Sequence, residues 1–421
     1  MIPFKIALTD PELGWLFFGI LALFLCATLL AELFSYFRLP RVIGELAGGI
    51  LLGPSGLGYV WPDAYNKMFH YFPEQGKILS FLYWFGLILL MLSAGFHLKS
   101  QSDSQDTKLL TVLFVSSTLI PALGGIVYCR LYDFTPHIGP AGTPLSMTVI
   151  VCLAVAITSI PVISKIFMDL GIIDTRFAKI VLAVAISHDI ILWAVLGIVL
   201  NANHRSIFRE CGVAFCSVIF LVAATIVAYC VAKFARKIVS IKLSESRSIF
   251  TIIAICLMMV FGVNMLGINI IFGALMAGVI FSGLRTGNFY RAKETISKFA
   301  ISFFIPIYFA IVGLKINLPA YFNGRLVVSF LLVSSGIMLV SVIIGLKAIR
   351  ETWLTCFNFA IAMMARGGPG IVLASIAYEG SLIDGELFVA LVLVALITSF
   401  ATGAWFRFVL NKKWPLYAEV A

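Results

Sequence analysis

The feature that most constrains this chain is the recurrence of long apolar runs along its whole length. Each run has roughly 20 residues, the length that an α-helix needs to cross the hydrocarbon core of a bilayer. With 61% apolar and only 12% charged residues, the chain has more apolar surface than a soluble core can bury. An open sheet would leave backbone groups unpaired in lipid, so the spans must be helices. We therefore predict an all-α membrane protein. Its thirteen predicted spans are residues 13–36, 41–60, 78–97, 109–130, 144–168, 175–200, 207–232, 247–264, 266–284, 297–318, 325–346, 352–377 and 385–410.

The distribution of Lys and Arg predicts how these spans are oriented. If the N-terminus lies outside and the spans alternate, 21 of the 30 basic residues fall in inside loops and 8 fall in outside segments. Cytoplasmic loops of membrane proteins carry such an excess. We therefore expect a multi-pass protein of the cell membrane (plasma or inner membrane) with its C-terminus in the cytoplasm. This distribution accounts for the net charge of +10, so we expect no nucleic-acid partner.

Two kinds of pattern recur seven spans apart. Glycines five residues apart occur in the second span (Gly44–Gly49) and in the ninth (Gly273–Gly278). Polar, Pro-containing interruptions occur in the fifth span (Thr158–Pro161) and in the twelfth (Arg366–Gly370). Because seven is odd, the partners cross the membrane in opposite directions. The pattern predicts an inverted repeat with two crossed discontinuous helices, as in many secondary transporters. The alternative is that Gly and Pro are simply common in membrane helices.

One carboxylate stands out as a candidate for binding an ion. Asp189 lies midway along the sixth span between apolar residues, and a charge at that depth is costly enough to indicate a function. Such a group can hold a proton or a cation in turn. The alternative is a structural Asp bonded to hydroxyl groups or paired with Arg366. Glu45, beside Arg41, is interpreted as a structural charge.

The interruptions offer ligands for a cation near this carboxylate. Unwound backbone exposes carbonyl oxygens, and Thr158 and Ser159 add hydroxyl groups of the kind that hard cations prefer. Adjacent helix positions are about 100° apart, so His188 either faces the ion or packs as an ordinary histidine, and both interpretations stay open. We expect Arg366 to donate to the freed carbonyls. The residues expected to stabilise the crossover are Arg366, Pro161, Gly367, Gly368 and Pro369.

Other kinds of chemistry find no support in the sequence. It contains no nucleophile–base pair, phosphate-binding loop or metal-ligand spacing, and its eight cysteines are scattered. We therefore expect no enzyme, no catalytic residue, no cofactor and no transition-metal site. The stretch from Asn411 to Ala421 is too short for a soluble regulatory domain.

Several of these segments resemble one known family, the monovalent cation:proton antiporter-2 family of Na⁺/H⁺ and K⁺/H⁺ exchangers. Residues Pro40–Gly56 are similar to its second-helix signature, and Ala156–Ser159 resembles its unwound helix. The run through Asp189 resembles its ion-binding helix, and Ala365–Gly370 resembles its second crossover. The resemblance covers nearly the whole chain.

The resemblance implies a fold, a partner and a site. It implies that residues 1–421 form one transmembrane antiporter domain. It also implies that the protein is a homodimer in which a core slides against a dimerisation scaffold. The resemblance also assigns ion binding to Asp189, Thr158 and Ser159. Two departures are His188, where the family usually has Asp, Asn or Gln, and the interior of the eleventh span, where many members have a Lys or Arg. This chain is apolar there, and Lys347 lies only at the end of that span. The core corresponds to residues of about 109–200 and 325–410, and the scaffold to about 13–97 and 207–318.

We thus expect a secondary antiporter in which H⁺ and Na⁺ or K⁺ share one carboxylate, with elevator-type alternating access. Two alternatives remain open. The first is a symporter of the same fold for an organic solute, with Asp189 binding a co-ion. The second is a transport-inactive membrane sensor, suggested by His188 and by the missing cation in the eleventh span.

Overall fold

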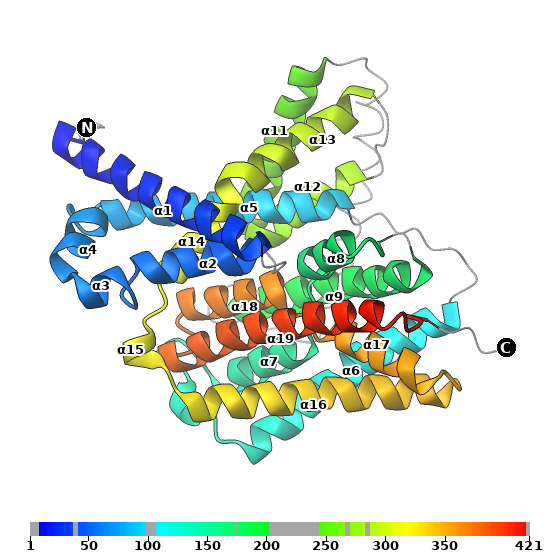
Figure 1. Cartoon of the computed structure of the whole chain (residues 1–421). Helices are drawn as coiled ribbons and strands as arrows, with labels where there is room; N and C mark the ends of the chain where they lie inside the picture. Colours follow the sequence, from blue (N-terminus) through cyan, green and yellow to red (C-terminus); the bar gives the residue numbers. More distant parts are fainter. Residues whose placement is uncertain are drawn as a thin grey trace. The chain divides into compact units, whose positions relative to one another are not determined.

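The computed structural model describes residues 8–36, 41–97, 107–173, 175–201, 244–265, 270–282 and 287–417 (Figure 1). These residues form helices and no β-sheet; their one extended pairing is an isolated antiparallel bridge between Ile138 and Ile383. The elements are α1 (Asp10–Tyr36), α2 (Arg41–Leu52), α3 (Leu57–Val60), α4 (Pro62–Phe69), α5 (Gln75–His97), α6 (Thr107–Leu131), η2 (Thr135–His137), α7 (Pro144–Ala156), α8 (Ile160–Asp169), α9 (Arg176–Asn201), α11 (Glu245–Met265), α12 (Ile270–Ser282), α13 (Gly287–Phe299), η4 (Ala300–Phe304), α14 (Ile305–Leu314), α15 (Leu318–Tyr321), α16 (Gly324–Ala348), α17 (Trp353–Met363), α18 (Gly367–Glu379) and α19 (Gly385–Asn411).

The predicted class of fold, an all-α membrane protein, is confirmed. Within the described residues, eight helices are long and apolar enough to cross a membrane, and shorter apolar helices accompany them. The predicted span 207–232 lies outside the described residues. The total of thirteen spans stays a prediction.

The first discontinuous helix consists of α7 and α8. α7 begins with a capping box, in which the Thr143 and Ser146 side chains each accept a hydrogen bond from the other's backbone N–H. It ends at Ala156, and the backbone at Ile157 is extended, with φ −73° and ψ 141°. Pro161 falls in the first turn of α8, where its missing N–H costs no helical hydrogen bond. The sequence therefore ends one helix and starts another within three residues.

The second discontinuous helix consists of α17 and α18. α17 ends at Met363, and α18 begins at Gly367, whose φ of +33° favours glycine. Pro369 again lies in a first turn, where proline is tolerated. Both interruptions predicted from Pro and Gly are therefore real breaks in helices.

The chain divides into two compact units, and the first comprises residues 1–90 and 295–321. In this unit α2 packs against α1 and α14, and α1 also packs against α14 and α4. The contact between α2 and α14 is close because Gly49 faces the backbone of Ala310, and Gly313 faces the backbone of Leu46. Glycines thus let two helical backbones approach one another.

The second unit comprises residues 91–294 and 322–421. In it the C-terminal helices α16–α19, coloured gold to red in Figure 1, pack against α6–α9. Four buried phenylalanine rings fill the space between α8, α9, α17 and α19: Phe167, Phe177, Phe359 and Phe406. Their ring centroids lie 4.7–5.7 Å apart in the contacting pairs, distances typical of favourable aromatic contacts. This packing positions both discontinuous helices.

Candidate functional site

The two helix interruptions meet inside the second unit. The backbone N–H of Ser159 donates to the carbonyl oxygen of Ala365 at 2.6 Å, and the Thr158 hydroxyl donates to the carbonyl oxygen of Met363 at 2.6 Å. Thr158 and Ser159 are fully buried. Each break therefore satisfies backbone groups that the other leaves without helical partners, as a buried break requires.

Gly367 lies close against the first discontinuous helix. A Cβ at this position would collide with the Val162 side chain and would crowd the Ser159 hydroxyl. Its backbone N–H donates to the Ser399 hydroxyl of α19 at 3.0 Å. Ser399 could not be singled out from the sequence, because only its hydroxyl group distinguishes it within an apolar helix.

Arg366 lies against the end of α7. Its Nε donates to the carbonyl oxygen of Ala154 at 3.0 Å, and its Nη2 lies 3.5 Å from that of Val155. The side chain is 2% exposed, and Nη1 has no hydrogen-bond partner among the described residues. The last carbonyls of a helix lack helical donors and carry a partial negative charge, so the guanidinium group both satisfies and neutralises this helix end.

Helix α9 carries Asp189 past this crossover. α9 packs against all four half-helices, namely α7, α8, α17 and α18. The backbone at Asp189 is helical, while its side chain lies outside what the structure describes. The same holds for the Pro161 side chain. The structure thus brings the helix of Asp189 together with both interruptions, and Gly368 and Pro369 lie buried in the first turn of α18.

The His188 side chain points to α6. Its Nε2 lies 3.1 Å from the Ser117 hydroxyl oxygen, and its ring lies near Phe114. The residue is 3% exposed, and Nδ1 has no hydrogen-bond partner among the described residues. A neutral imidazole can share one proton with a hydroxyl in this way. His188 therefore connects α9 to α6 rather than to the two breaks.

Glu45 belongs to the first unit and is buried in α2. The basic residue one turn before it, Arg41, is ion-paired with Glu32 of α1 through an Nη2–Oε1 distance of 2.7 Å. One carboxylate oxygen of Glu45, Oε2, has no hydrogen-bond partner among the described residues. Its role as a structural charge stays a prediction.

The crossover has the chemical groups that cation binding requires. The C-terminal ends of α7 and α17 and the N-terminal ends of α8 and α18 flank it, which supplies partial charges of both signs. The Thr158 hydroxyl donates its proton to Met363, so its oxygen lone pairs can still coordinate a cation. The Ser159 hydroxyl accepts a hydrogen bond from the Val162 N–H at 3.3 Å and retains a second lone pair.

A second group of polar side chains lies at the connection between α6 and α7 and at the start of α19. His137, Asp384 and Glu386 come together there, although 247 residues separate the first two. No spacing in the sequence could reveal this group, because His137 comes from the connection between α6 and α7, whereas Asp384 and Glu386 come from the start of α19.

Comparison with known proteins agrees with this architecture. The family model described as "Sodium/hydrogen exchanger, transmembrane" matches residues 20–412. The chain is similar to the Na(+)/H(+)-K(+) antiporter GerN of Bacillus cereus, with 25% identity over 94% of this chain and 97% of that protein. It is also 26% identical to Cation/H(+) antiporter 17 of Arabidopsis thaliana over 93% of its own length. The chain spans about half the length of the plant relatives it matches, 48% in that case.

A solved structure shares the fold. The sodium proton antiporter MjNhaP1 from Methanocaldococcus jannaschii superimposes with a TM-score of 0.67, and the match covers 96% of this chain and 99% of that chain. The sequence identity is 16%, so this likeness concerns the fold alone. The family model covers nearly the whole chain, and the chain therefore belongs to the sodium/hydrogen exchanger family.

Proposed function

We propose that this protein exchanges a monovalent cation, Na⁺ or K⁺, for protons, and that Asp189 binds both in turn. The observation that carries the proposal is the packing of α9, the helix of Asp189, against all four half-helices of the two breaks. Membership of the exchanger family supports the same reaction. So do the names of the relatives, which mention Na(+), K(+) and H(+).

In this mechanism Asp189 is neutralised either by a proton or by a cation. An ionised carboxylate without a partner is expensive to carry through a low-dielectric region. The empty, charged site therefore stays on one side of the membrane, while the site occupied by a proton or by a cation can move across it. Because only one occupant fits at a time, the movement of cations becomes coupled to the movement of protons in the opposite direction.

The crossover residues take two roles in this proposal. Thr158 and Ser159 provide oxygen ligands for the cation beside Asp189. Arg366 holds the end of α7 through its bonds to Ala154 and Val155. The residues that keep the breaks together with it are Pro161, Gly367, Gly368 and Pro369.

We further propose elevator-type alternating access, in which the core helices move against a scaffold that forms a homodimer. The expected core is about 109–200 and 325–410, and the expected scaffold is about 13–97 and 207–318. In this proposal the protein lies in the cell membrane, with its N-terminus outside the cell and its C-terminus in the cytoplasm. Mass measurement of the detergent-solubilised protein tests the dimer, and labelling of single cysteines from each side tests the orientation.

The central experiment compares Asp189→Asn with Asp63→Asn in proteoliposomes. A pH gradient is imposed, and its dissipation by Na⁺, K⁺ or Li⁺ is followed with a pH-sensitive dye. Asp189→Asn removes the titratable group, so we expect exchange to fall to the level of empty vesicles. Asp63 is exposed in α4, and its replacement should leave exchange unchanged. Exchange by Asp189→Asn at the rate of the unmodified protein would refute the proposal.

A further inference from the structure

The connection between α6 and α7 is bound through its backbone to the connection between α18 and α19. Gly139 N–H donates to the carbonyl oxygen of Leu382 at 3.0 Å, and Ala141 N–H donates to that of Ser381 at 2.9 Å. Asp384 N–H also donates to the carbonyl oxygen of His137 at 3.0 Å. These bonds fix His137 next to the first turn of α19.

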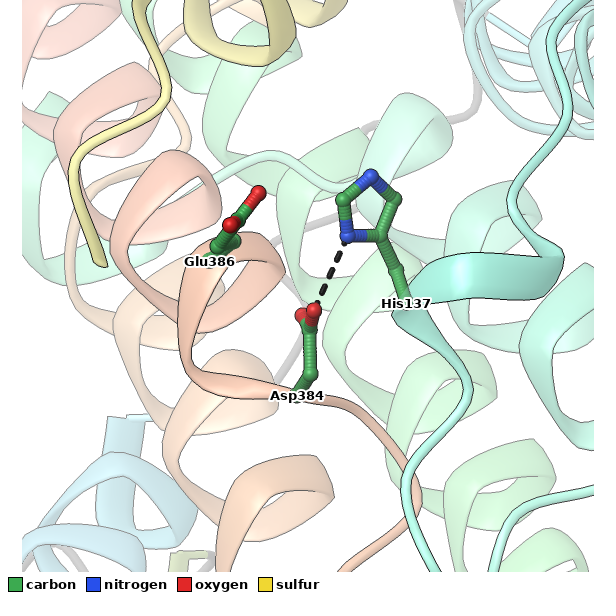
Figure 2. Close-up of side chains that lie close together, drawn as sticks. All are labelled: His137, Asp384 and Glu386. Carbon is green, nitrogen blue, oxygen red and sulfur yellow. Dashed lines mark hydrogen bonds and ion pairs between the residues drawn. The ribbon is translucent and has the colours of Figure 1, made fainter. Parts of the chain in front are cut away.

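Three side chains with metal-binding atoms converge at this place. His137 Nδ1 lies 3.0 Å from Asp384 Oδ2, and one ligand atom each from His137, Asp384 and Glu386 lie within 4.8 Å of one another. Figure 2 shows the imidazole and the two carboxylates turned toward one another. His137 is only 7% exposed, whereas both acidic residues are partly open to solvent. The group thus has a buried ring nitrogen on one side and an accessible side.

Each of the two carboxylates accepts a structural hydrogen bond through one oxygen, and its other oxygen can coordinate a metal ion. Asp384 Oδ1 accepts a hydrogen bond from the Leu387 N–H at 2.8 Å, and its Oδ2 faces His137. Glu386 Oε2 accepts from the Asn323 side-chain amide at 2.8 Å, which leaves Oε1 available. Donors that orient ligand side chains in this manner accompany metal sites and strengthen them.

A simple ion pair between His137 and Asp384 explains only part of this arrangement. It does not account for Glu386, which an amide from the start of a third helix, α16, holds beside the pair. With a neutral imidazole the three side chains carry two negative charges, which a divalent cation balances. One imidazole nitrogen with two carboxylate oxygens is also a ligand set that zinc accepts.

We propose that His137, Asp384 and Glu386 bind one divalent transition-metal ion of the zinc class, with water in the fourth position. Ligands at 2.0–2.1 Å in a tetrahedron lie about 3.3 Å from one another. The ligand atoms now lie within 4.8 Å of one another, so binding requires the carboxylate of Glu386, which is bonded to Asn323 through Oε2, to move closer to His137 and Asp384. A bound ion links η2, in the connection between α6 and α7, to the start of α19 and stabilises this part of the second unit.

The experiment uses the full chain, purified in detergent without a polyhistidine tag. Zinc binding is measured by equilibrium dialysis, and thermal unfolding is followed with and without micromolar zinc. We expect one zinc ion per chain and a higher unfolding temperature when zinc is present. Magnesium, which prefers oxygen ligands alone, should give neither effect.

Three variants make the test specific. Glu386→Gln and His137→Gln each remove one ligand, and we expect at least a tenfold loss of zinc affinity in both. Glu386→Gln retains an oxygen for Asn323, so it should fold like the unmodified chain. His70→Gln changes an exposed histidine of another connection and should bind zinc normally. Zinc affinity in Glu386→Gln equal to that of the unmodified chain, or no binding by the unmodified chain at micromolar zinc, overturns the proposal.

These measurements do not depend on transport. Repeating them with Asp189→Asn should give the same zinc affinity, because Asp189 belongs to none of the elements that hold the three ligands. A failure of cation exchange and a failure of zinc binding can therefore be told apart.

Discussion

At the scale of single residues, Asn358 shows how one buried amide holds the segment that follows α19. Its side-chain nitrogen donates to the carbonyl oxygens of Pro415 and Leu416 at 3.3 and 3.0 Å, and its oxygen accepts from the Trp405 indole N–H at 3.0 Å. We expect Asn358→Ala to leave these part-buried groups without their hydrogen bonds and to lower the free energy of unfolding by about 1–3 kcal/mol. Denaturation in mixed detergent micelles measures this change.

The matched control for this prediction is Asn66→Ala. Asn66 is exposed in α4, so its side chain should contribute little, within about 0.5 kcal/mol. Equal effects of the two substitutions would show that the buried amide does not hold the C-terminal segment.

At Gly367 the addition of a single methyl group should disturb the structure. Its positive φ and its contact with Val162 leave no place for a methyl group. We predict that Gly367→Ala forces the two breaks apart, lowers the unfolding temperature and abolishes cation exchange in proteoliposomes. Gly336→Ala, at a helical position with nothing within 4 Å of the new Cβ, should retain both. A Gly367→Ala protein with normal exchange would contradict the proposed role of the crossover.

At the scale of elements, the pairing of α2 with α14 depends on Gly49. A Cβ there would overlap the carbonyl group of Ala310, so Gly49→Ala must push the helices apart. We expect a loss of about 1–3 kcal/mol from overpacking. Gly14→Ala in α1, where the Cβ meets nothing within 4 Å, should be neutral or stabilising by about 0.5–1 kcal/mol, because alanine favours a helix more than glycine does. Thermal unfolding of both variants in the same detergent distinguishes them.

Elements with strong local signals could be predicted from the sequence. Long apolar runs gave the helices, and Pro161 and the Gly367–Gly370 segment gave the breaks, because proline and glycine act on the backbone where they stand. The short helix α3 could not be predicted, since the predicted span 41–60 is apolar beyond the point where α2 ends at Leu52. The π-helical segment η4 between α13 and α14 likewise leaves no local pattern.

The sequence draws attention to the residues at the two breaks but not to their partners on other helices. Thr158, Ser159 and Arg366 stood out because polar residues are rare in apolar spans. Ser399 was missed because its role comes from a contact with Gly367 on another helix. His137 and Asp384 were missed because hydrophilic residues are ordinary in connections between helices, and only the backbone bonds between two connections bring them together.

At the scale of the whole molecule, Glu351 makes stability depend on pH. It lies between α16 and α17, 9% exposed, and its Oε2 has no hydrogen-bond partner among the described residues. This burial raises the pKa of the Glu351 carboxyl above its ordinary value of 4.5, against the opposing effects of the Tyr417 hydroxyl and Arg176. The folded protein therefore holds this proton to a higher pH than the unfolded chain does.

The direction of the pH effect follows from that difference. Between the ordinary and the raised pKa the folded state binds more protons than the unfolded state, so the free energy of unfolding falls as pH rises. We predict that Glu351→Gln removes this contribution to the fall in the free energy of unfolding from pH 4.5 upward. Glu74→Gln, at an exposed position, should leave that contribution in place. Unfolding temperatures measured across this pH range test the prediction, and parallel curves for Glu351→Gln and the unmodified protein would contradict it.

The mutual hydrogen bonding of the two breaks also has a consequence for biosynthesis. Thr158 finds its acceptor, Met363, 205 residues further along the chain, and a ribosome adds only about 5–20 residues per second. For many seconds the first interruption has no counterpart, and its polar backbone must stay in contact with water or with the insertion machinery. The crossover can therefore form only after α17 has been synthesised, well after α7 and α8 have left the ribosome.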